Sequence, residues 1–306
     1  MKFGVMVGQH GFSYHDIKEV CAACEQMGYT HFWLVDHFMP YNQSVDTRAP
    51  MLECWSTLSA LSVEFKKIRL GPLVTCASYR NPSLLAKICA TVDQISQGRL
   101  ELGIGAGWFK EEFERFGFPF DEFDVRVKKL EEAVQIIKAM WSKEEATFEG
   151  LFYRVKNALC YPKPVQRFPK IWIGAEKNKM LKVAAKLADN WNFASDINRY
   201  TLEEYAKKVE IFEKHCKELG KNPASIEKSV LTKLFIAESA ESLRSKASKM
   251  GIKINSHPAL TGTPDECTKT LEAYEDLGVS HFVFAIEHKR SLSELELFSK
   301  LVMPSF

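Results

Sequence analysis

The chain has 306 residues, 46% of them hydrophobic, and its 41 basic and 39 acidic residues leave a formal net charge of +2. A chain of this length buries a large core without disulfide or metal support. No basic stripe with interleaved aromatic residues occurs, which argues against nucleic acid as a partner. Neither a signal peptide nor a membrane span is recognisable in the sequence, so we expect a cytoplasmic protein.

Eight cysteines are scattered along the chain. Without an export signal, free thiols are favoured over disulfides. Cys21 and Cys24 form a C-x-x-C pair, but they share the apolar face of an expected helix with Ile17 and Val20. Since no second cysteine pair or histidine cluster accompanies them, packing is favoured over redox or metal chemistry. We expect no metal site.

Strand-like runs alternate with amphipathic helices along the whole chain, which is typical of a parallel sheet with crossover helices. The eight strand-like runs are 2–7, 31–37, 68–75, 99–107, 170–175, 190–194, 229–238 and 281–287. Helices are expected at 13–27, 51–65 and 178–187, and on the apolar stripes of Leu85, Ile88, Val92 and Ile95 and of Val127, Leu130, Val134, Ile137 and Trp141. The pattern predicts a single domain, 1–306, that forms a closed (β/α)8 TIM barrel, with its active site at the carboxyl ends of the strands.

Two segments break the alternation. Residues 143–168 resemble a β-hairpin, with strands at 146–148 and 151–155 and a turn at 149–150, and we expect this insertion to cover the barrel mouth. A second irregular stretch, 251–263, precedes a helix that opens with Thr263-Pro264-Asp265-Glu266, where the proline suits a first helical turn. Insertions at the mouth therefore account for the length beyond a minimal barrel.

Glycines occupy every second position in the run 99–108. Because strand side chains alternate between faces, Gly103, Gly105 and Gly107 leave one face without side-chain atoms. Such a face can accept a flat ring against the backbone. A single glycine would more simply mark a turn or close strand packing. Three in register, followed by Trp108 and an acidic helix start at 110–112, favour a cofactor bed.

Asp36 and His37 follow the second strand and are the best candidates for proton transfer, because a carboxylate beside an imidazole can fix its tautomer. Adjacent strand residues point to opposite faces, so both serve one site only if the strand ends there. The alternative is a capping carboxylate with a hydrogen-bonded loop histidine. Other polar residues at strand ends are Gln9, His10, Thr75, Cys76, Glu287 and His288.

The turn 174–177 leads from the fifth strand into a helix, where backbone N–H groups can bind an anion. An ordinary strand-to-helix turn is the alternative. No G-x-S-x-G elbow or P-loop is present.

Several segments together resemble the bacterial luciferase-like superfamily, and within it the oxidoreductases that use coenzyme F420, an 8-hydroxy-5-deazaflavin. The matching segments are 32–38, 51–53, 79–82, 97–99, 102–108, 161–166, 173–174 and 188–191. They span almost the whole chain in the family's order. Collectively they are specific for the superfamily, whereas most are individually weak.

The resemblance implies a barrel whose mouth holds the deazaflavin or flavin ring, and a hydride passed between that ring and a small organic substrate. It places Asp36 and His37 at the ring edge, with His37 relaying a proton. The strand 70–76 is implied to carry a bulge with a non-prolyl cis peptide, expected at Leu73–Val74. The implied cofactor-binding residues are Leu73, Val74, Thr75, Gly105, Ala106, Gly107, Trp108, Gly174, Ala175 and Glu176. Relatives are commonly dimers, so a homodimer is expected.

Trp108 departs from relatives that oxidise alcohols or sugar phosphates, which have a glutamate at this position. An indole cannot act as a general acid, so reduction of an activated double bond or carbonyl gains support, and Trp108 instead walls the substrate pocket. Two alternatives remain: an FMN-dependent monooxygenase of the same framework, and a non-catalytic barrel that binds a pigment or partner. Aromatic residues near the mouth indicate an apolar or planar substrate, or else a subunit interface.

Overall fold

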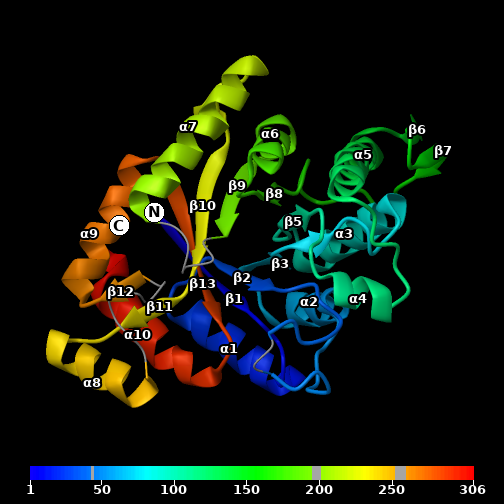
Figure 1. The fold of residues 1–306 in the computed structure, drawn as a ribbon. Coiled ribbons are helices and arrows are strands. Elements are labelled where there is room, and N and C mark those ends of the chain that lie inside the picture. The colour runs from blue at the N-terminus through cyan, green and yellow to red at the C-terminus, as the bar shows by residue number, and fades with distance from the viewer. Residues whose placement is uncertain (43–44, 195–200, 252–259) are drawn as a thin grey trace.

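Parallel strands form a barrel in this computed structural model, which describes residues 1–42, 45–194, 201–251 and 260–306. The strand order is β3-β2-β1-β13-β10-β9-β8-β5-β4 (Figure 1). The ring closes where Leu70 pairs with Leu100, since the Leu70 amide donates to the Arg99 carbonyl (3.0 Å) and the Glu101 amide to the Leu70 carbonyl (2.9 Å). The strands are β1 (Lys2–Val7), β2 (His31–Leu34), β3 (Arg69–Pro72), β4 (Thr75–Cys76), β5 (Leu102–Gly105), β8 (Ile171–Gly174), β9 (Asn190–Ala194), β10 (Glu227–Thr232) and β13 (Val279–Ile286).

Helices surround this barrel in Figure 1. They are α1 (Tyr14–Gln26), α2 (Cys54–Glu64), α3 (Pro82–Ser96), α4 (Lys110–Arg115), α5 (Phe123–Ser142), α6 (Asn178–Leu187), α7 (Leu202–Glu218), α8 (Ala240–Met250), α9 (Pro264–Asp276) and α10 (Leu292–Leu301). Side-chain caps set several starts: Ser13, Thr201 and Thr263 each form a capping box. In the part of the chain that the structure describes, none of these helices has the length and apolar character to cross a membrane.

The third barrel strand is interrupted in its middle. β3 ends at Pro72 and β4 begins at Thr75, and the peptide bond between them at Leu73–Val74 is cis. The cis peptide therefore lies at the position that the resemblance implied. Counting β3 and β4 as one strand confirms the expected closed eight-stranded barrel.

The glycine row of β5 faces this interrupted strand. A Cβ atom built on Gly103 would overlap the Pro72 carbonyl oxygen, and one built on Gly105 would lie 2.9 Å from Val74 Cγ2. The isopropyl group of Val74 thus occupies the space that we expected a cofactor ring to fill directly. The correction has a simple cause: the glycines leave room for the bulge of the neighbouring strand, so that Val74, and not β5, is the surface next to the mouth.

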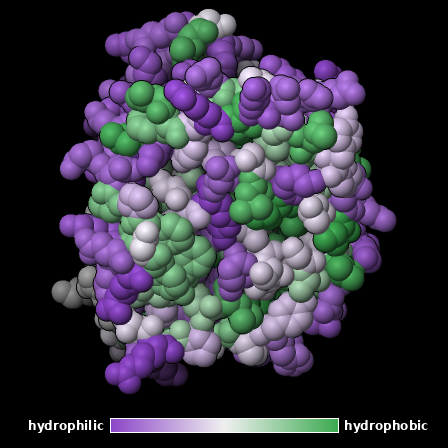
Figure 2. Space-filling view, turned by 90° about the vertical axis from the view of Figure 1, so that its right-hand side faces the viewer, coloured by the Kyte–Doolittle hydropathy of each residue, from purple (hydrophilic) through white to green (hydrophobic). Residues whose placement is uncertain are grey.

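The expected hairpin forms, as β6 (Glu145–Glu149) and β7 (Arg154–Leu159), but it lies elsewhere than we expected. The Glu132 carboxylate of α5 accepts backbone hydrogen bonds from Leu151, Phe152 and Tyr153, and Gln94 of α3 donates to the Lys163 carbonyl (2.8 Å). These contacts hold the insertion against the outer side of α3 and α5, so it does not cover the mouth. Figure 2 shows this side of the molecule, where hydrophobic groups alternate with hydrophilic ones.

The expected strand 229–238 is divided. β10 pairs with β13 up to Thr232, with a register shift between Lys228 and Ser229, and the chain then leaves the barrel. The next residues form β11 (Leu234–Ile236), which pairs with β12 (Leu260–Gly262) in a separate two-stranded sheet. This insertion does follow the carboxyl end of a barrel strand. Most of the irregular stretch expected at 251–263 lies outside the described residues.

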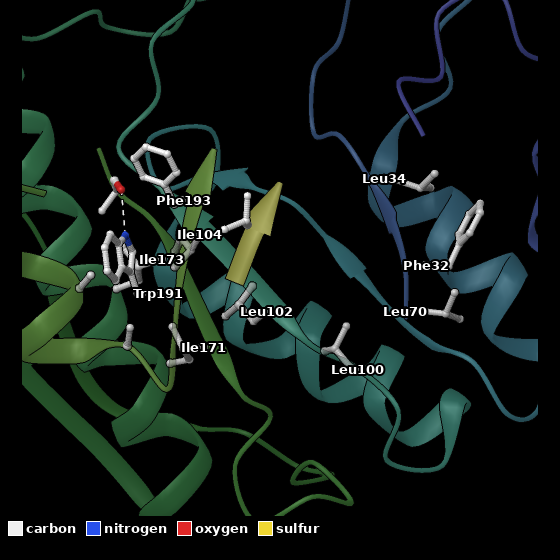
Figure 3. Close-up of a cluster of buried hydrophobic side chains, with 14 of the residues drawn as sticks. Phe32, Leu34, Leu70, Leu100, Leu102, Ile104, Ile171, Ile173, Trp191 and Phe193 are labelled. Carbon is white, nitrogen blue, oxygen red and sulfur yellow. Dashed lines mark hydrogen bonds between the residues drawn. The ribbon is translucent and has the colours of Figure 1, made fainter. Parts of the chain in front are cut away.

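Two hydrophobic layers follow from the alternation of strand side chains. The outer layer lies between barrel and helices and includes the residues drawn in Figure 3, where the Trp191 indole also donates to the Ala175 carbonyl (2.8 Å). Its labelled members are Phe32, Leu34, Leu70, Leu100, Leu102, Ile104, Ile171, Ile173, Trp191 and Phe193. The inner layer fills the barrel with Met6, Trp33, Val35, Leu73, Trp172 and Val283. With the interior filled, chemistry is left to the strand ends.

Candidate active site at the carboxyl ends of the strands

His37 lies beyond the end of β2 and is paired with a glutamate from another unit. Its Nδ1 lies 2.8 Å from Glu112 Oε2, and Glu112 belongs to α4, which follows β5. The His37 side chain is 16% exposed whereas that of Glu112 is fully buried. The imidazole therefore spans the boundary between a buried carboxylate and the barrel mouth.

Glu112 is held in its ionised form by a dense set of donors. Its Oε1 accepts from the backbone amide of Phe38 (2.6 Å), and its Oε2 accepts from the Tyr79 hydroxyl as well as from His37. Burial alone would raise the pKa of Glu112, but the hydrogen bonds from His37 and Tyr79 outweigh it and hold the pKa below its usual value. Since an ionised carboxylate only accepts hydrogen bonds, Nδ1 of His37 carries a proton and Nε2 is the nitrogen that can exchange one.

Asp36 points into a different network. Both of its oxygens accept from the Arg80 guanidinium, at 2.5 and 3.0 Å, and the Thr75 hydroxyl donates to Oδ2 as well. Arg80 also donates to Glu53 (2.6 Å). The buried Asp36 therefore ties the loop after β2 to the loop after β4 and to the start of α2, and it does not contact His37 through a hydrogen bond.

An aromatic row crosses the mouth beside His37. The ring of Tyr41 lies 4.5 Å from that of His37 and 4.8 Å from that of His10, measured between centroids. Trp108 lies 5.8 Å from His37 and stacks on Phe109 at 5.3 Å. At 61% exposure, the Trp108 indole is an open apolar surface next to the imidazole.

Gly107 and Ala106 close the turn after β5. Gly107 has a φ of +79°, and a Cβ there would overlap Cys76 Sγ and lie 2.8 Å from Phe113 Cζ. Only glycine suits both the backbone conformation and this approach. Ala106 is buried. The turn thus serves to bring Trp108 and α4, with Glu112, up to His37.

The turn after β8 has room on one side. A Cβ on Gly174 would meet only Val74 Cγ1, at 3.9 Å, an ordinary contact. The Ala175 amide is already used, because it donates to the Asn192 carbonyl (3.0 Å). No side chain caps the start of α6, whose N-cap is Lys177. The first amides of α6 are therefore a better anion site than the Ala175 amide that we expected to contribute, and Glu176 lies directly before them.

The structure thus brings His37, Val74, Trp108 and Gly174 to the same end of the barrel. Asp36 and His37 belong to different hydrogen-bond networks, with Arg80 and with Glu112. Glu112 was not among the expected site residues. A signal for it exists in the sequence: Glu112 occupies the i+3 position of an apolar stripe with Phe109, Phe113 and Phe116, where an acidic residue is unusual.

The chain is similar to known proteins in sequence and in fold. A sequence model described as luciferase-like monooxygenase matches residues 1–257. The F420-dependent glucose-6-phosphate dehydrogenase of Amycolatopsis mediterranei (strain U-32) is 25% identical over 334 aligned residues, which cover 99% of this chain and 98% of that protein.

Solved structures agree on the fold. The coenzyme F420 dependent tetrahydromethanopterin reductase from Methanopyrus kandleri superposes with a TM-score of 0.81 at 20% identity, covering 100% of this chain and 99% of the other. A type II Baeyer-Villiger monooxygenase from Pseudomonas putida, solved with FMN, superposes with a TM-score of 0.76 at 17% identity, covering 100% and 99%. With the family model matching most of its length, this chain belongs to the luciferase-like monooxygenase family.

Proposed function

We propose that this protein is an oxidoreductase that transfers a hydride between coenzyme F420 and a small organic substrate. The observation that carries the proposal is the His37–Glu112 pair at the mouth of a luciferase-family barrel. The Amycolatopsis relative, which aligns with nearly the whole chain, is named as an F420-dependent enzyme. An imidazole that can exchange a proton beside an open aromatic surface suits a reaction in which hydride transfer is coupled to proton transfer.

The residues at the mouth fit such a coenzyme. Val74 would back the ring, with Leu73 and Thr75 holding the bulge on either side of it. Gly174 leaves space next to Val74, and the amides at the start of α6, after Ala175 and Glu176, would receive the phosphate. When bound, the deazaflavin supplies the hydride chemistry, while the protein supplies orientation and a dry environment.

His37 is the proposed catalytic residue and Asp36 a positioning residue. Nε2 of His37 would take up or release the proton that accompanies hydride transfer, while Glu112 keeps Nδ1 protonated and stabilises the imidazolium. Asp36, through Arg80 and Thr75, would hold the loops that carry His37 and the bulge. An indole at Trp108 in place of a carboxylate favours reduction of an activated double bond or carbonyl.

FMN-dependent oxygenation is the second candidate, favoured by the likeness to the FMN-containing monooxygenase. To decide, the purified protein is mixed separately with oxidised F420 and FMN, desalted, and examined by visible absorption. Retention of F420 alone, with reduced F420 consumed by substrate and not by oxygen, is expected. Retention of FMN with rapid oxygen uptake after reduction would replace the proposal, and retention of neither would indicate a non-catalytic barrel.

We also propose a cytoplasmic homodimer. Apolar side chains are exposed on the neighbouring helices α2 and α3, with Val63 58%, Leu84 55% and Ile95 38% exposed, which supports a partner surface there. The eight cysteines are free and buried, as suits a reducing compartment. Light scattering after size exclusion should give twice the chain mass, and Leu84→Glu should reduce it to the monomer.

A further inference from the structure

His10 is buried at the mouth without a hydrogen-bond partner. His10 comes three residues after the end of β1 and is 6% exposed. Neither Nδ1 nor Nε2 of its ring has a hydrogen-bond partner among the described residues. Leaving a buried polar group unpaired is costly, so such a group usually pairs with water or with a ligand. The mechanism proposed above makes no use of this side chain.

The local packing builds a place for His10. Gly8 gives the ring its space, since a Cβ there would lie 3.0 Å from His10 Nε2 and 3.1 Å from the Tyr41 hydroxyl oxygen. Tyr41 packs edge-on against His10 and lies on its other side against His37. His10 and His37 therefore flank the same tyrosine.

The charge around His10 favours an uncharged ligand. Burial lowers the pKa of His10 below its ordinary value, although the Glu287 carboxylate acts against this, so the imidazole is neutral near pH 7. A neutral imidazole offers one donor and one acceptor. Glu287 itself interacts with Asn42 (3.3 Å) and Lys233 (3.6 Å), and its negative charge disfavours a phosphate or carboxylate near His10.

We propose that His10 is a specificity-determining residue that donates a hydrogen bond to the oxygen of an uncharged, flat carbonyl substrate whose rings or conjugated part lie against Tyr41 and Trp108. The assignment rests on the proposed function, since it takes the end of the barrel that carries His37 as the substrate site. It predicts a different substrate class from the sugar phosphate in the name of the Amycolatopsis relative.

Paired probes that differ only in the oxygen test this assignment. Acetophenone and ethylbenzene share a phenyl ring, and only the first carries a carbonyl oxygen. Calorimetry of the whole protein should show acetophenone binding about fivefold or more tightly, the worth of one neutral hydrogen bond. In His10→Phe, which keeps an aromatic ring but removes both nitrogens, the two probes should bind equally. The matched control is His15→Phe, since the His15 side chain is 77% exposed on α1 and should leave the preference unchanged.

A second measurement, on the wild-type protein, tests the assignment even if His10→Phe folds poorly. In wild-type protein labelled with [15N]histidine, acetophenone should shift the His10 imidazole resonances while ethylbenzene should not. An unchanged preference in a folded His10→Phe, an unmoved His10 resonance, failure of both probes to bind, or tighter binding of glucose 6-phosphate would each overturn the inference. Retention of F420 is measured on the same samples: loss of F420 binding with the acetophenone preference intact would refute the proposed function and leave the His10 site standing.

Discussion

Both ends of the barrel carry histidines near a glutamate, but these histidines differ in exposure and in hydrogen bonding. At the amino end, His31 and His281 are 5% and 1% exposed, and their rings lie 4.4 Å apart beneath the Trp172 indole. At the carboxyl end, the His37 side chain is 16% exposed and bonded to an ionised Glu112. Burial lowers the pKa of His31 to about 3 and holds that of His281 well below its ordinary value.

The difference separates a structural from a chemical use of histidine. At the amino end a glutamate is present as well: Glu101 accepts hydrogen bonds from Trp172 (2.7 Å) and Arg69 (2.5 Å), and its Oε1 lies 3.7 Å from His31 Nε2, beyond hydrogen-bond distance. Burial disfavours the charged form of both histidines, and His31 Nδ1 lies 2.8 Å from the Thr30 hydroxyl oxygen. At the carboxyl end, the His37 side chain is partly exposed and has a hydrogen-bonded carboxylate partner. Residue type alone does not distinguish the two ends.

The largest effect is expected from His37→Ala. Turnover with F420 should fall by about a hundredfold or more, the usual worth of a positioned acid or base, while F420 affinity remains nearly unchanged. Steady-state kinetics and a spectroscopic F420 titration measure the two quantities. His281→Leu is the control at the opposite end and should keep its turnover. Equal losses of turnover in the two variants would end the distinction, and equal losses of binding and turnover in His37→Ala would make His37 a structural contact.

Gly105→Val should weaken F420 binding by about tenfold or more. A Cβ at this position would already lie 2.9 Å from Val74 Cγ2, and overpacking costs about 1–3 kcal/mol, so Val74 must shift into the space proposed for the ring. The dissociation constant for F420 and the melting temperature are compared with those of Gly105→Ala, in which a smaller effect is expected. A valine variant that binds F420 normally would show that the glycine row is packing space alone.

Glu112→Gln should reduce turnover by about tenfold, since a charge-assisted hydrogen bond is replaced by a neutral one. His37 loses its carboxylate partner while the proposed coenzyme contacts stay in place, so the dissociation constant for F420 should stay nearly unchanged. Glu111→Gln removes a charge one residue away, where the carboxylate pairs with Arg115 at the surface, and should change neither quantity. Equal losses of turnover and of F420 affinity in Glu112→Gln would contradict the role of Glu112 as a partner of His37.

The sequence predicts the barrel well because strand and helix periods are local properties. The resemblance to the luciferase-like family also predicts the cis peptide bond at Leu73–Val74, which the structure confirms. Prediction from the sequence fails where side chains from different units meet. Glu112 follows Lys110 and Glu111 in a first helical turn, where acidic residues commonly face solvent, and only the packing of α4 against the loop after β2 buries it.

The expected Asp36–His37 pair and the expected open glycine face are both absent from the described residues, for the same physical reason. The order Asp36-His37 indicates a pair, but the partner of each lies far along the chain, in Arg80 and Glu112. Likewise the spacing of Gly103 and Gly105 predicts an open face on β5. The sequence of β5 gives no indication that the Val74 side chain of the neighbouring strand fills this face. Interactions between units depend on how the loops are placed, which no single segment encodes.

The smallest effect is expected at the amino end and concerns stability in acid. His31 and His281 have native pKa values far below the unfolded value of about 6.5, so below that pH the unfolded chain takes up protons that the native protein does not. Stability should therefore fall as the pH drops from about 6.5 towards 3, by on the order of 1 kcal/mol per histidine at pH 5.5. Lys2, Lys170 and Arg69 oppose protonation there, while Glu227 favours it.

His281→Leu removes one titrating group and two buried nitrogens without a partner among the described residues, so it should make the free energy of unfolding less dependent on pH between 7 and 5. Urea unfolding at several pH values measures the slope, and the exposed His15→Leu, which should leave it unchanged, is the control. A steeper or unchanged slope in His281→Leu would show that the amino end titrates after all, and that its histidines differ from His37 in place only.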